Sequence, residues 1–127
     1  MQKLVFTLLL LAGITFNSVH AQSGLLSPNA FEKMLNSDKT VQLVDVRTPD
    51  EFRGGHINGA VNYDFYAADF AKKLATLDKK RPVMVYCAAG GRSGSAAGQL
   101  KDLGFNKVYD LDGGMGAWRE AGKKVVQ

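Results

Sequence analysis

Short apolar runs alternate along this chain with segments in which apolar residues recur every three or four positions. The short runs are rich in β-branched residues, which predicts strands buried on both faces, as in a parallel sheet. The predicted strands are residues 41–46, 60–62, 83–86 and 108–111. The segments with helical spacing are residues 28–36, 65–77, 95–103 and 115–121.

Two capping signals mark where helices begin. Ser27-Pro28 combines an N-cap residue with proline at the first helical position. Thr48 to Glu51 form a capping box that contains a proline, which predicts a further, short helix. Strands and helices therefore alternate throughout, and we predict an α/β fold: a single domain with a central parallel sheet and helices on both faces.

The first 21 residues have the order of a secretory signal peptide. Lys3 gives a positive start, residues 4–14 form an apolar run, and Val19-His20-Ala21 precedes a cleavage site. A membrane anchor is the alternative, but spanning a bilayer takes about 20 apolar residues and this run has eleven. We therefore expect a signal peptide at 1–21, a domain at 22–127 without stable membrane insertion, and export to the periplasm.

The composition is that of a globular domain, with 46% hydrophobic and 22% charged residues among 127. Cys87 is the only cysteine, so no disulfide can form within the chain. One cysteine and two histidines exclude a four-ligand Cys/His zinc site, and no motif calls for a metal or an organic cofactor. The basic residues are not interleaved with aromatic ones, so no nucleic-acid partner is predicted.

The segment after the predicted strand 83–86 has the residue types that hold an ionised sulfur. Cys87 follows the strand directly, and the residues that would surround its sulfur are Ala88, Ala89, Gly90, Gly91, Arg92 and Ser93. Small residues let the backbone curl, so that several N–H groups point at one anion and lower the pKa of a thiol. Arg92 would hold the charged group of a donor or point outward, and Ser93 would cap the next helix or donate to the sulfur. The alternative is a tight strand-to-helix turn with an incidental cysteine, but this combination of residue types favours the anion site.

Three segments resemble the rhodanese, or sulfurtransferase, family. Residues 87–93 are similar to its active-site loop, residues 45–52 and 55–62 to its amino-terminal signature, and residues 111–118 to its carboxyl-terminal signature. The resemblance implies a five-stranded parallel sheet flanked by helices and a cysteine persulfide as the covalent intermediate. Related phosphatases have a longer loop than the four residues that separate Cys87 from Arg92, so a terminal sulfur is favoured over phosphate as the bound anion.

The loop and the resemblance together predict a single-domain sulfurtransferase. The Cys87 thiolate would take the outer sulfur of a small anionic donor such as thiosulfate and pass it to a thiol or cyanide acceptor. Two alternatives stay open: a persulfide carrier without turnover, and a thiol-redox or binding module in the cell envelope. Because a lone thiol in an oxidising compartment must be kept reduced, we also expect a thioredoxin-like reducing partner.

Four polar residues are candidates for structural support of the site: Asp45, Arg47, Glu51 and His56. Asp45 and Arg47 either shape the edge of the site or form an ion pair that ties the strand end to Glu51 or to a neighbouring loop, and we favour the ion pair. His56 could be a base, as in cysteine proteases, but its place in the signature favours a structural hydrogen-bonding role. Three aromatic residues either line the mouth of the site or belong to the core: Phe65, Tyr66 and Phe70.

Overall fold

The computed structural model of the protein describes residues 2–3 and 23–127. The predicted signal peptide at 1–21 lies outside the described residues, apart from Gln2 and Lys3. Within the described part of the chain, no helix has both the length and the apolar character needed to cross a membrane.

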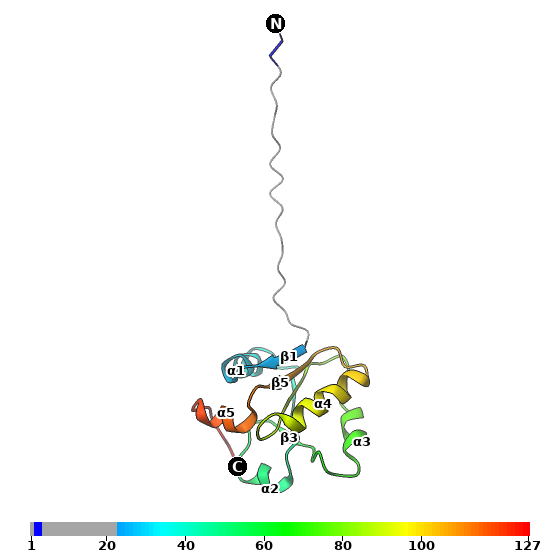
Figure 1. Ribbon diagram of the computed structural model, residues 1–127, viewed down its shortest axis with the longest axis vertical. Helices are drawn as coiled ribbons and strands as arrows, with labels where there is room; N and C mark the ends of the chain where they lie inside the picture. Colours follow the sequence, from blue (N-terminus) through cyan, green and yellow to red (C-terminus); the bar gives the residue numbers. More distant parts are fainter. Residues whose placement is uncertain (1, 4–22) are drawn as a thin grey trace.

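Strands and helices alternate along residues 23–127, as the hydrophobic pattern predicts. The strands are β1 (Ser23–Leu26), β2 (Gln42–Asp45), β3 (Val61–Asn62), β4 (Val83–Tyr86) and β5 (Val108–Leu111). The helices are α1 (Pro28–Ser37), α2 (Pro49–Arg53), α3 (Phe70–Ala75), α4 (Gly91–Asp102) and α5 (Gly114–Glu120). All neighbouring strands are parallel, in the order β1-β5-β4-β2-β3. Figure 1 shows the edge strand β1 beside β5. The α/β fold with a five-stranded parallel sheet is therefore confirmed.

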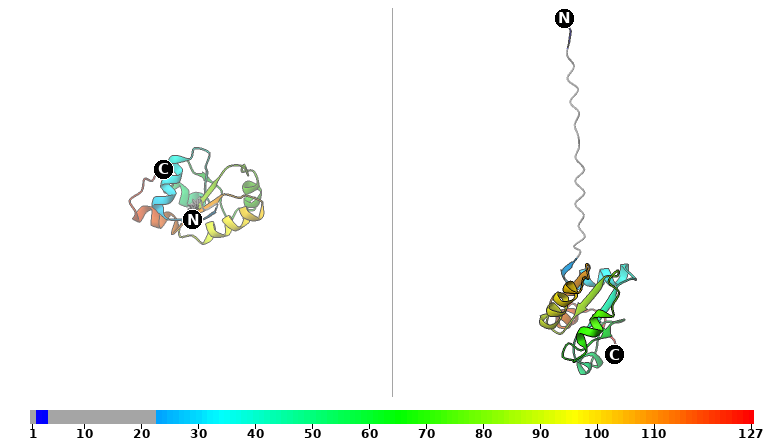
Figure 2. Two further views of the ribbon diagram at one scale, coloured as in Figure 1. Left: turned by 90° about the horizontal axis from the view of Figure 1, so that it is seen from above. Right: turned by 90° about the vertical axis from the view of Figure 1, so that its right-hand side faces the viewer.

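Helices cover both faces of the sheet. On one face, Phe70 of α3 and Leu100 of α4 pack against the strands. On the other face, Phe31 of α1 and Trp118 of α5 do so. The left view of Figure 2 shows α1 and α5 on one side of the molecule and α3 and α4 on the other. The central strand β4 is buried along its whole length, which explains why its sequence is a continuous apolar run.

The edge strand β1 is not predicted by the hydrophobic pattern. It pairs with β5 in parallel, with Ser23 opposite Val108 and Leu26 opposite Leu111. Its sequence contains serine and glycine, and the side chain of Leu25 is 65% exposed. A short edge strand of this kind buries too little apolar surface to give a strand pattern, so only its pairing with β5 defines it.

The helix predicted at 65–77 is wrong at its amino-terminal end, because α3 begins only at Phe70. The preceding residues are held by β2: the amide of Tyr63 donates to Asp45 O at 2.9 Å and that of Phe65 to Val46 O at 3.1 Å. The next amide, that of Tyr66, donates to the Asp64 carboxylate at 3.0 Å. These amides are already bonded outside a helix, so helical hydrogen bonding starts later.

The helix predicted at 95–103 begins four residues earlier, at Gly91. The amide of Gly94 donates to Gly90 O at 2.9 Å, so the glycine-rich segment is itself the first turn of α4. Glycine has low helix propensity, which is why the sequence pattern placed the start too late. Arg92 and Ser93 therefore lie in the first helical turn and not in the loop before it.

Both capping predictions are confirmed. The Ser27 hydroxyl accepts from the amide of Ala30 at 3.2 Å. The Thr48 hydroxyl accepts from the amide of Glu51 at 3.3 Å, and the Glu51 carboxylate accepts from the amide of Thr48 at 3.2 Å.

Because β2, β4 and β5 are parallel, the segments that follow them meet at one edge of the sheet.

Candidate active site

Cys87 is the first residue after β4, at the carboxyl edge of the sheet. Its side chain is only 1% exposed. The sulfur accepts hydrogen bonds from the amide of Gly90 at 3.0 Å and from the hydroxyl of Ser93 at 3.3 Å. Residues 87–93 therefore fold back on the sulfur; we call this segment the cysteine loop, although its last three residues form the first turn of α4.

The surroundings of the sulfur favour the thiolate. Burial opposes ionisation, but the Ser93 hydroxyl and the nearby backbone amides, Gly90 among them, favour the charged form, and their combined effect lowers the pKa of the Cys87 thiol. The sequence predicts amide donors from Ala88 to Ser93. Of these six amides, that of Gly90 makes a hydrogen bond to the unmodified sulfur.

The turn of the cysteine loop depends on one glycine conformation. Gly90 has φ +118°, in the left-handed region that side-chain-bearing residues rarely adopt. A Cβ atom at this position would meet nothing within 4 Å, so the backbone angle and not a lack of space requires glycine there. This angle turns the chain from the end of β4 into α4 and aims the Gly90 amide at the sulfur.

The first turn of α5 holds the cysteine loop from outside. The amide of Met115 donates to Cys87 O at 2.8 Å, and that of Gly116 to Ala88 O at 3.1 Å. Gly114 has φ +58°, and a Cβ atom on it would lie 2.5 Å from Cys87 O. From the sequence we assigned no role to Gly113-Gly114 and so missed this support. The signal was present in the carboxyl-terminal signature, residues 111–118, which resembled the family without a physical role being assigned to it.

Arg92 and Glu51 form a bidentate ion pair at the side of the cysteine loop. The Nη1 atom of Arg92 is 2.6 Å from Glu51 Oε1, and its Nη2 atom is 3.0 Å from Oε2. The hydrogen bonds from Arg92 outweigh partial burial and lower the pKa of Glu51 to about 2. The guanidinium also lies over the ring of Tyr66, 5.8 Å from its centroid. Arg92 is thus held by protein side chains at the rim of the loop.

The three aromatic candidates divide between rim and core. Phe70 is 5% exposed and belongs to the core, and Phe65 packs against the same cluster. Tyr66 is 69% exposed and contacts Arg92. Of the three, only Tyr66 is accessible at the rim of the cysteine loop.

Asp45 and Arg47 form a buried ion pair, as favoured from the sequence. Arg47 Nη2 lies 2.7 Å from Asp45 Oδ2 and donates to Gly55 O, also at 2.7 Å. The pair ties the end of β2 to the loop after α2. The expected alternative partner, Glu51, is instead bonded to Arg92.

His56 lies beside α2 and contacts Phe52. Its Nδ1 atom is 2.9 Å from Phe52 O, and the two rings stack with centroids 3.7 Å apart. Its backbone forms a bridge with Val126, which places the carboxyl terminus beside α2 in Figure 1. These contacts give His56 a structural position, whereas the donors to the sulfur come from the cysteine loop itself.

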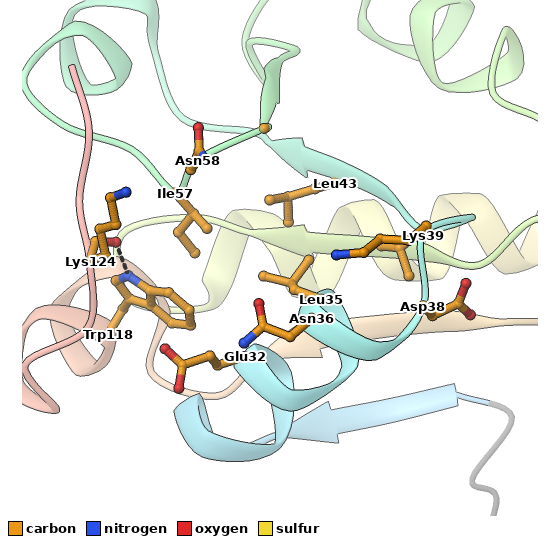
Figure 3. A pocket seen from close by; sticks show the side chains of 12 residues that line it. Glu32, Leu35, Asn36, Asp38, Lys39, Leu43, Ile57, Asn58, Trp118 and Lys124 are labelled. Carbon is orange, nitrogen blue, oxygen red and sulfur yellow. Dashed lines mark hydrogen bonds between the residues drawn. The ribbon is translucent and has the colours of Figure 1, made fainter.

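A hollow of about 550 Å³ lies between α1 and α5, on the face that Phe31 and Trp118 cover (Figure 3). Its acidic side chains are already bonded: Glu32 with Lys123 at 2.9 Å and Asp38 with Thr40 at 2.6 Å. No residue of the cysteine loop lines it. This hollow is therefore separate from the candidate site.

No group of three or more His, Cys, Asp and Glu side chains that could hold a metal ion occurs in the described part of the chain. The chemistry available at the site is that of the Cys87 sulfur and its hydrogen-bond donors. A buried, hydrogen-bonded thiolate is a nucleophile that needs no separate base to remove its proton.

Comparison with known proteins places this geometry in a family. The model of the rhodanese-like domain matches residues 27–121. Thiosulfate sulfurtransferase GlpE of Shewanella oneidensis is 42% identical over 96 residues, which cover 76% of this chain and 92% of that protein.

Solved structures agree with the family match. The rhodanese-related protein of Thermoplasma volcanium superposes with a TM-score of 0.70 at 30% identity, covering 80% of this chain and 95% of that one. The rhodanese-like domain of an Anabaena protein superposes with a TM-score of 0.71 at 26% identity, covering 80% and 77%. The match over most of the chain, together with the cysteine loop at the carboxyl end of β4, shows that this protein belongs to the rhodanese-like domain family.

Proposed function

We propose that this protein is a rhodanese-type sulfurtransferase that moves a sulfane sulfur through a persulfide on Cys87. The observation that carries the proposal is the buried Cys87 sulfur, which accepts hydrogen bonds from Gly90 and Ser93 of its own loop. The curated relatives named thiosulfate sulfurtransferases support thiosulfate as the donor.

In the first step, the Cys87 thiolate attacks the outer sulfur of thiosulfate. A sulfur–sulfur bond forms to Cys87, the sulfur–sulfur bond of the donor breaks, and sulfite leaves with the electron pair. The charge of the protein is unchanged, because a thiolate becomes a persulfide anion. The lowered pKa of Cys87 supplies the thiolate, so no proton has to be removed at this step.

The persulfide adds one sulfur atom beyond Cys87 Sγ, and this atom also needs donors. The amides of Gly91 and Arg92 belong to the first turn of α4, where backbone N–H groups have no partner within the helix. A helix amino terminus also favours negative charge. We assign the outer sulfur to this end of α4.

In the second step, an acceptor attacks the outer sulfur and Cys87 returns as the thiolate. Cyanide leaves as thiocyanate, and a thiol leaves as its persulfide. Both acceptors use the same bond changes, so cyanide serves as the assay acceptor and a thiol as the cellular one.

The intact mass of the protein after thiosulfate treatment tests the persulfide. We expect a gain of one sulfur atom, loss of the gain on adding cyanide, and no gain in Cys87→Ala. Wild-type protein alkylated at Cys87 is the matched control, because it keeps the native chain. A reduced, folded protein that gains no sulfur would contradict the proposal.

Steady-state turnover separates an enzyme from a carrier. A sulfurtransferase releases many equivalents of thiocyanate per Cys87 from thiosulfate and cyanide. A carrier releases at most the one sulfur that it already holds and then stops, because thiosulfate does not reload it. We expect multiple turnovers, in line with the names of the curated relatives.

We further propose that the protein is exported to the periplasm and that residues 1–21 are removed. A thioredoxin-like reductant would then keep the Cys87 thiol reduced. The support is the charge and apolar pattern of the first residues and the single cysteine. Amino-terminal sequencing of protein from the periplasmic fraction tests this, with Gln22 as the expected first residue. Full-length protein found only in the cytoplasm would overturn it.

A further inference from the structure

Asp110 of β5 is a buried carboxylate without a counter-ion. Its side chain is only 6% exposed. Its Oδ1 atom has no hydrogen-bond partner, and no ion pair of Asp110 occurs in the described part of the chain. Burying a charged carboxylate without a partner costs folding free energy. Such a group is therefore either protonated in the folded protein or has a functional role.

Asp110 lies on the same face of the sheet as the start of α4. It is opposite Val85 of β4 in the strand register, two residues before Cys87. A Cβ atom built on Gly94 of α4 would lie 3.8 Å from Asp110 Oδ2. A hollow of about 320 Å³ is lined by Asp110, Gly90 and Gly94, among others. The carboxylate therefore sits under the turn that carries the sulfur's donors.

Ser93 directly precedes Gly94, the residue that lies against the Asp110 carboxylate, and its hydroxyl donates to the sulfur. It is fully buried, and its hydroxyl lies 3.3 Å from Cys87 Sγ and 3.3 Å from Gly90 O. Burial raises the pKa of Asp110, while hydrogen bonding with the Ser93 side chain lowers it. A serine hydroxyl has one proton to donate, so the sulfur, the Gly90 carbonyl and the Asp110 carboxylate compete for it.

None of the other charged groups near Asp110 forms an ion pair with it in the described part of the chain. Lys101 of α4 lines the same hollow but is exposed, and Asp112 at the end of β5 raises the pKa of Asp110 by repulsion. The β1 residues at the hollow, Gly24 and Leu25, carry no charge. Arg92 is bonded to Glu51.

We propose that Asp110 is a positioning residue that sets the reactivity of Cys87 through the hydroxyl of Ser93. When Asp110 is protonated, its hydroxyl donates a hydrogen bond to the Ser93 oxygen, and the Ser93 hydroxyl keeps its hydrogen bond to the sulfur. When Asp110 loses its proton to solvent, its carboxylate accepts a hydrogen bond from the Ser93 hydroxyl, and the sulfur loses that donor. The inference rests on the proposed function only in that the Cys87 thiolate is the reacting group.

The pH dependence of Cys87 alkylation by iodoacetamide tests this without any sulfur donor. Asp110→Asn replaces the charged acceptor with a weaker neutral one and offers an NH2 donor toward Ser93, so we expect alkylation roughly threefold faster than wild type below the thiol pKa. Ser93→Ala slows alkylation. In the double variant Asp110→Asn/Ser93→Ala, the effect of the asparagine disappears, because it acts only through the hydroxyl.

Two further variants make the outcome decisive. Asp110→Val removes the carboxylate with a residue suited to a strand, and it also speeds alkylation. Asp102→Asn removes an exposed negative charge at the carboxyl end of α4, away from Ser93, and leaves the rate within about 1.5-fold of wild type. An unchanged rate in Asp110→Asn, or an effect that persists without the Ser93 hydroxyl, would overturn the proposal. Absence of a persulfide would instead count against sulfur transfer, because alkylation does not depend on it.

Discussion

Arg92 and Glu51 are 41 residues apart in the sequence and meet through two parallel hydrogen bonds of 2.6 and 3.0 Å. The guanidinium of Arg92, the positive charge of the cysteine loop, is therefore already bound to a carboxylate when an anionic donor approaches. The pair joins α2 to the first turn of α4, so it links the amino-terminal signature to the loop that carries Cys87.

Glu51→Gln is expected to improve donor binding. Glutamine keeps the side-chain oxygen that the capping box uses, but it removes a negative charge beside an anion site. We expect the KM for thiosulfate to fall roughly twofold to threefold at low ionic strength, and the difference to shrink as salt is added. Asp50→Asn is the matched control, because Asp50 is exposed in the same helix and pairs with Arg53. An equal change in both variants would show that the pairing with Arg92 is irrelevant.

The same ion pair gives a pH-dependent part of the folding stability. The pKa of Glu51 is lowered to about 2 in the folded protein, chiefly by hydrogen bonding from Arg92. A carboxyl with a lowered folded pKa stabilises the fold above its unfolded pKa, and the contribution is lost as the pH falls toward 2. Because both side chains are partly exposed, we expect only about 0.5–1 kcal/mol. Urea unfolding of wild type and Glu51→Gln should differ by this amount at pH 7 and converge near pH 2.

Gly114→Ala is expected to disrupt the support of the cysteine loop. Its Cβ atom would lie 2.5 Å from Cys87 O and 2.7 Å from Ala88 C, at a φ of +58°. We expect a loss of at least about 2 kcal/mol in the free energy of unfolding, with a loss of activity. Gly98→Ala is the control: it lies in α4 with open space around it and should stabilise the protein by about 0.5–1 kcal/mol. A Gly114→Ala protein with native stability and activity would contradict the role given to α5.

Comparing Gly90→Ala with Gly104→Ala separates the effect of backbone strain from the effect on the Cys87 sulfur. Their φ angles are +118° and +96°, and a Cβ atom would meet nothing within 4 Å at either position. Substitution by alanine should therefore cost a similar amount of stability, about 1–2 kcal/mol. Only Gly90→Ala should raise the thiol pKa of Cys87 and lower turnover, because the Gly90 amide donates to the sulfur. Equal activity of the two variants would show that this amide does not matter.

The buried pair of Asp45 and Arg47 should matter for folding far more than a surface pair. The side chains are 0% and 5% exposed, so Arg47→Met leaves a buried carboxylate without its partner. We expect a loss of about 3–5 kcal/mol. Lys73→Met, which breaks the exposed pair with Asp69, should cost at most about 0.5 kcal/mol. Urea denaturation of both variants measures the difference, and similar losses would contradict a buried ion pair.

Local patterns in the sequence were sufficient for most of the elements and for the position of the nucleophile. The apolar run of β4 and the small residues after Cys87 are local features, so the strand, the turn and the thiol could be placed without knowing what packs around them. The error at the start of α3 arose because local preference and tertiary contacts disagree. Residues 65–69 have helical spacing, but the amides of Tyr63 and Phe65 are bonded to β2.

The sequence by itself determined the α/β fold, the helix caps and the loop of residues 87–93, because these follow from hydrophobic period, capping residues and glycine conformation within a few neighbouring positions. Only the tertiary structure decided which distant groups meet that loop. It brought Glu51 to Arg92, the amides of α5 to the carbonyl groups of Cys87 and Ala88, and Asp110 to the first turn of α4. Each of these contacts depends on parallel strands that end at one edge of the sheet, and that order is set by packing across the whole chain.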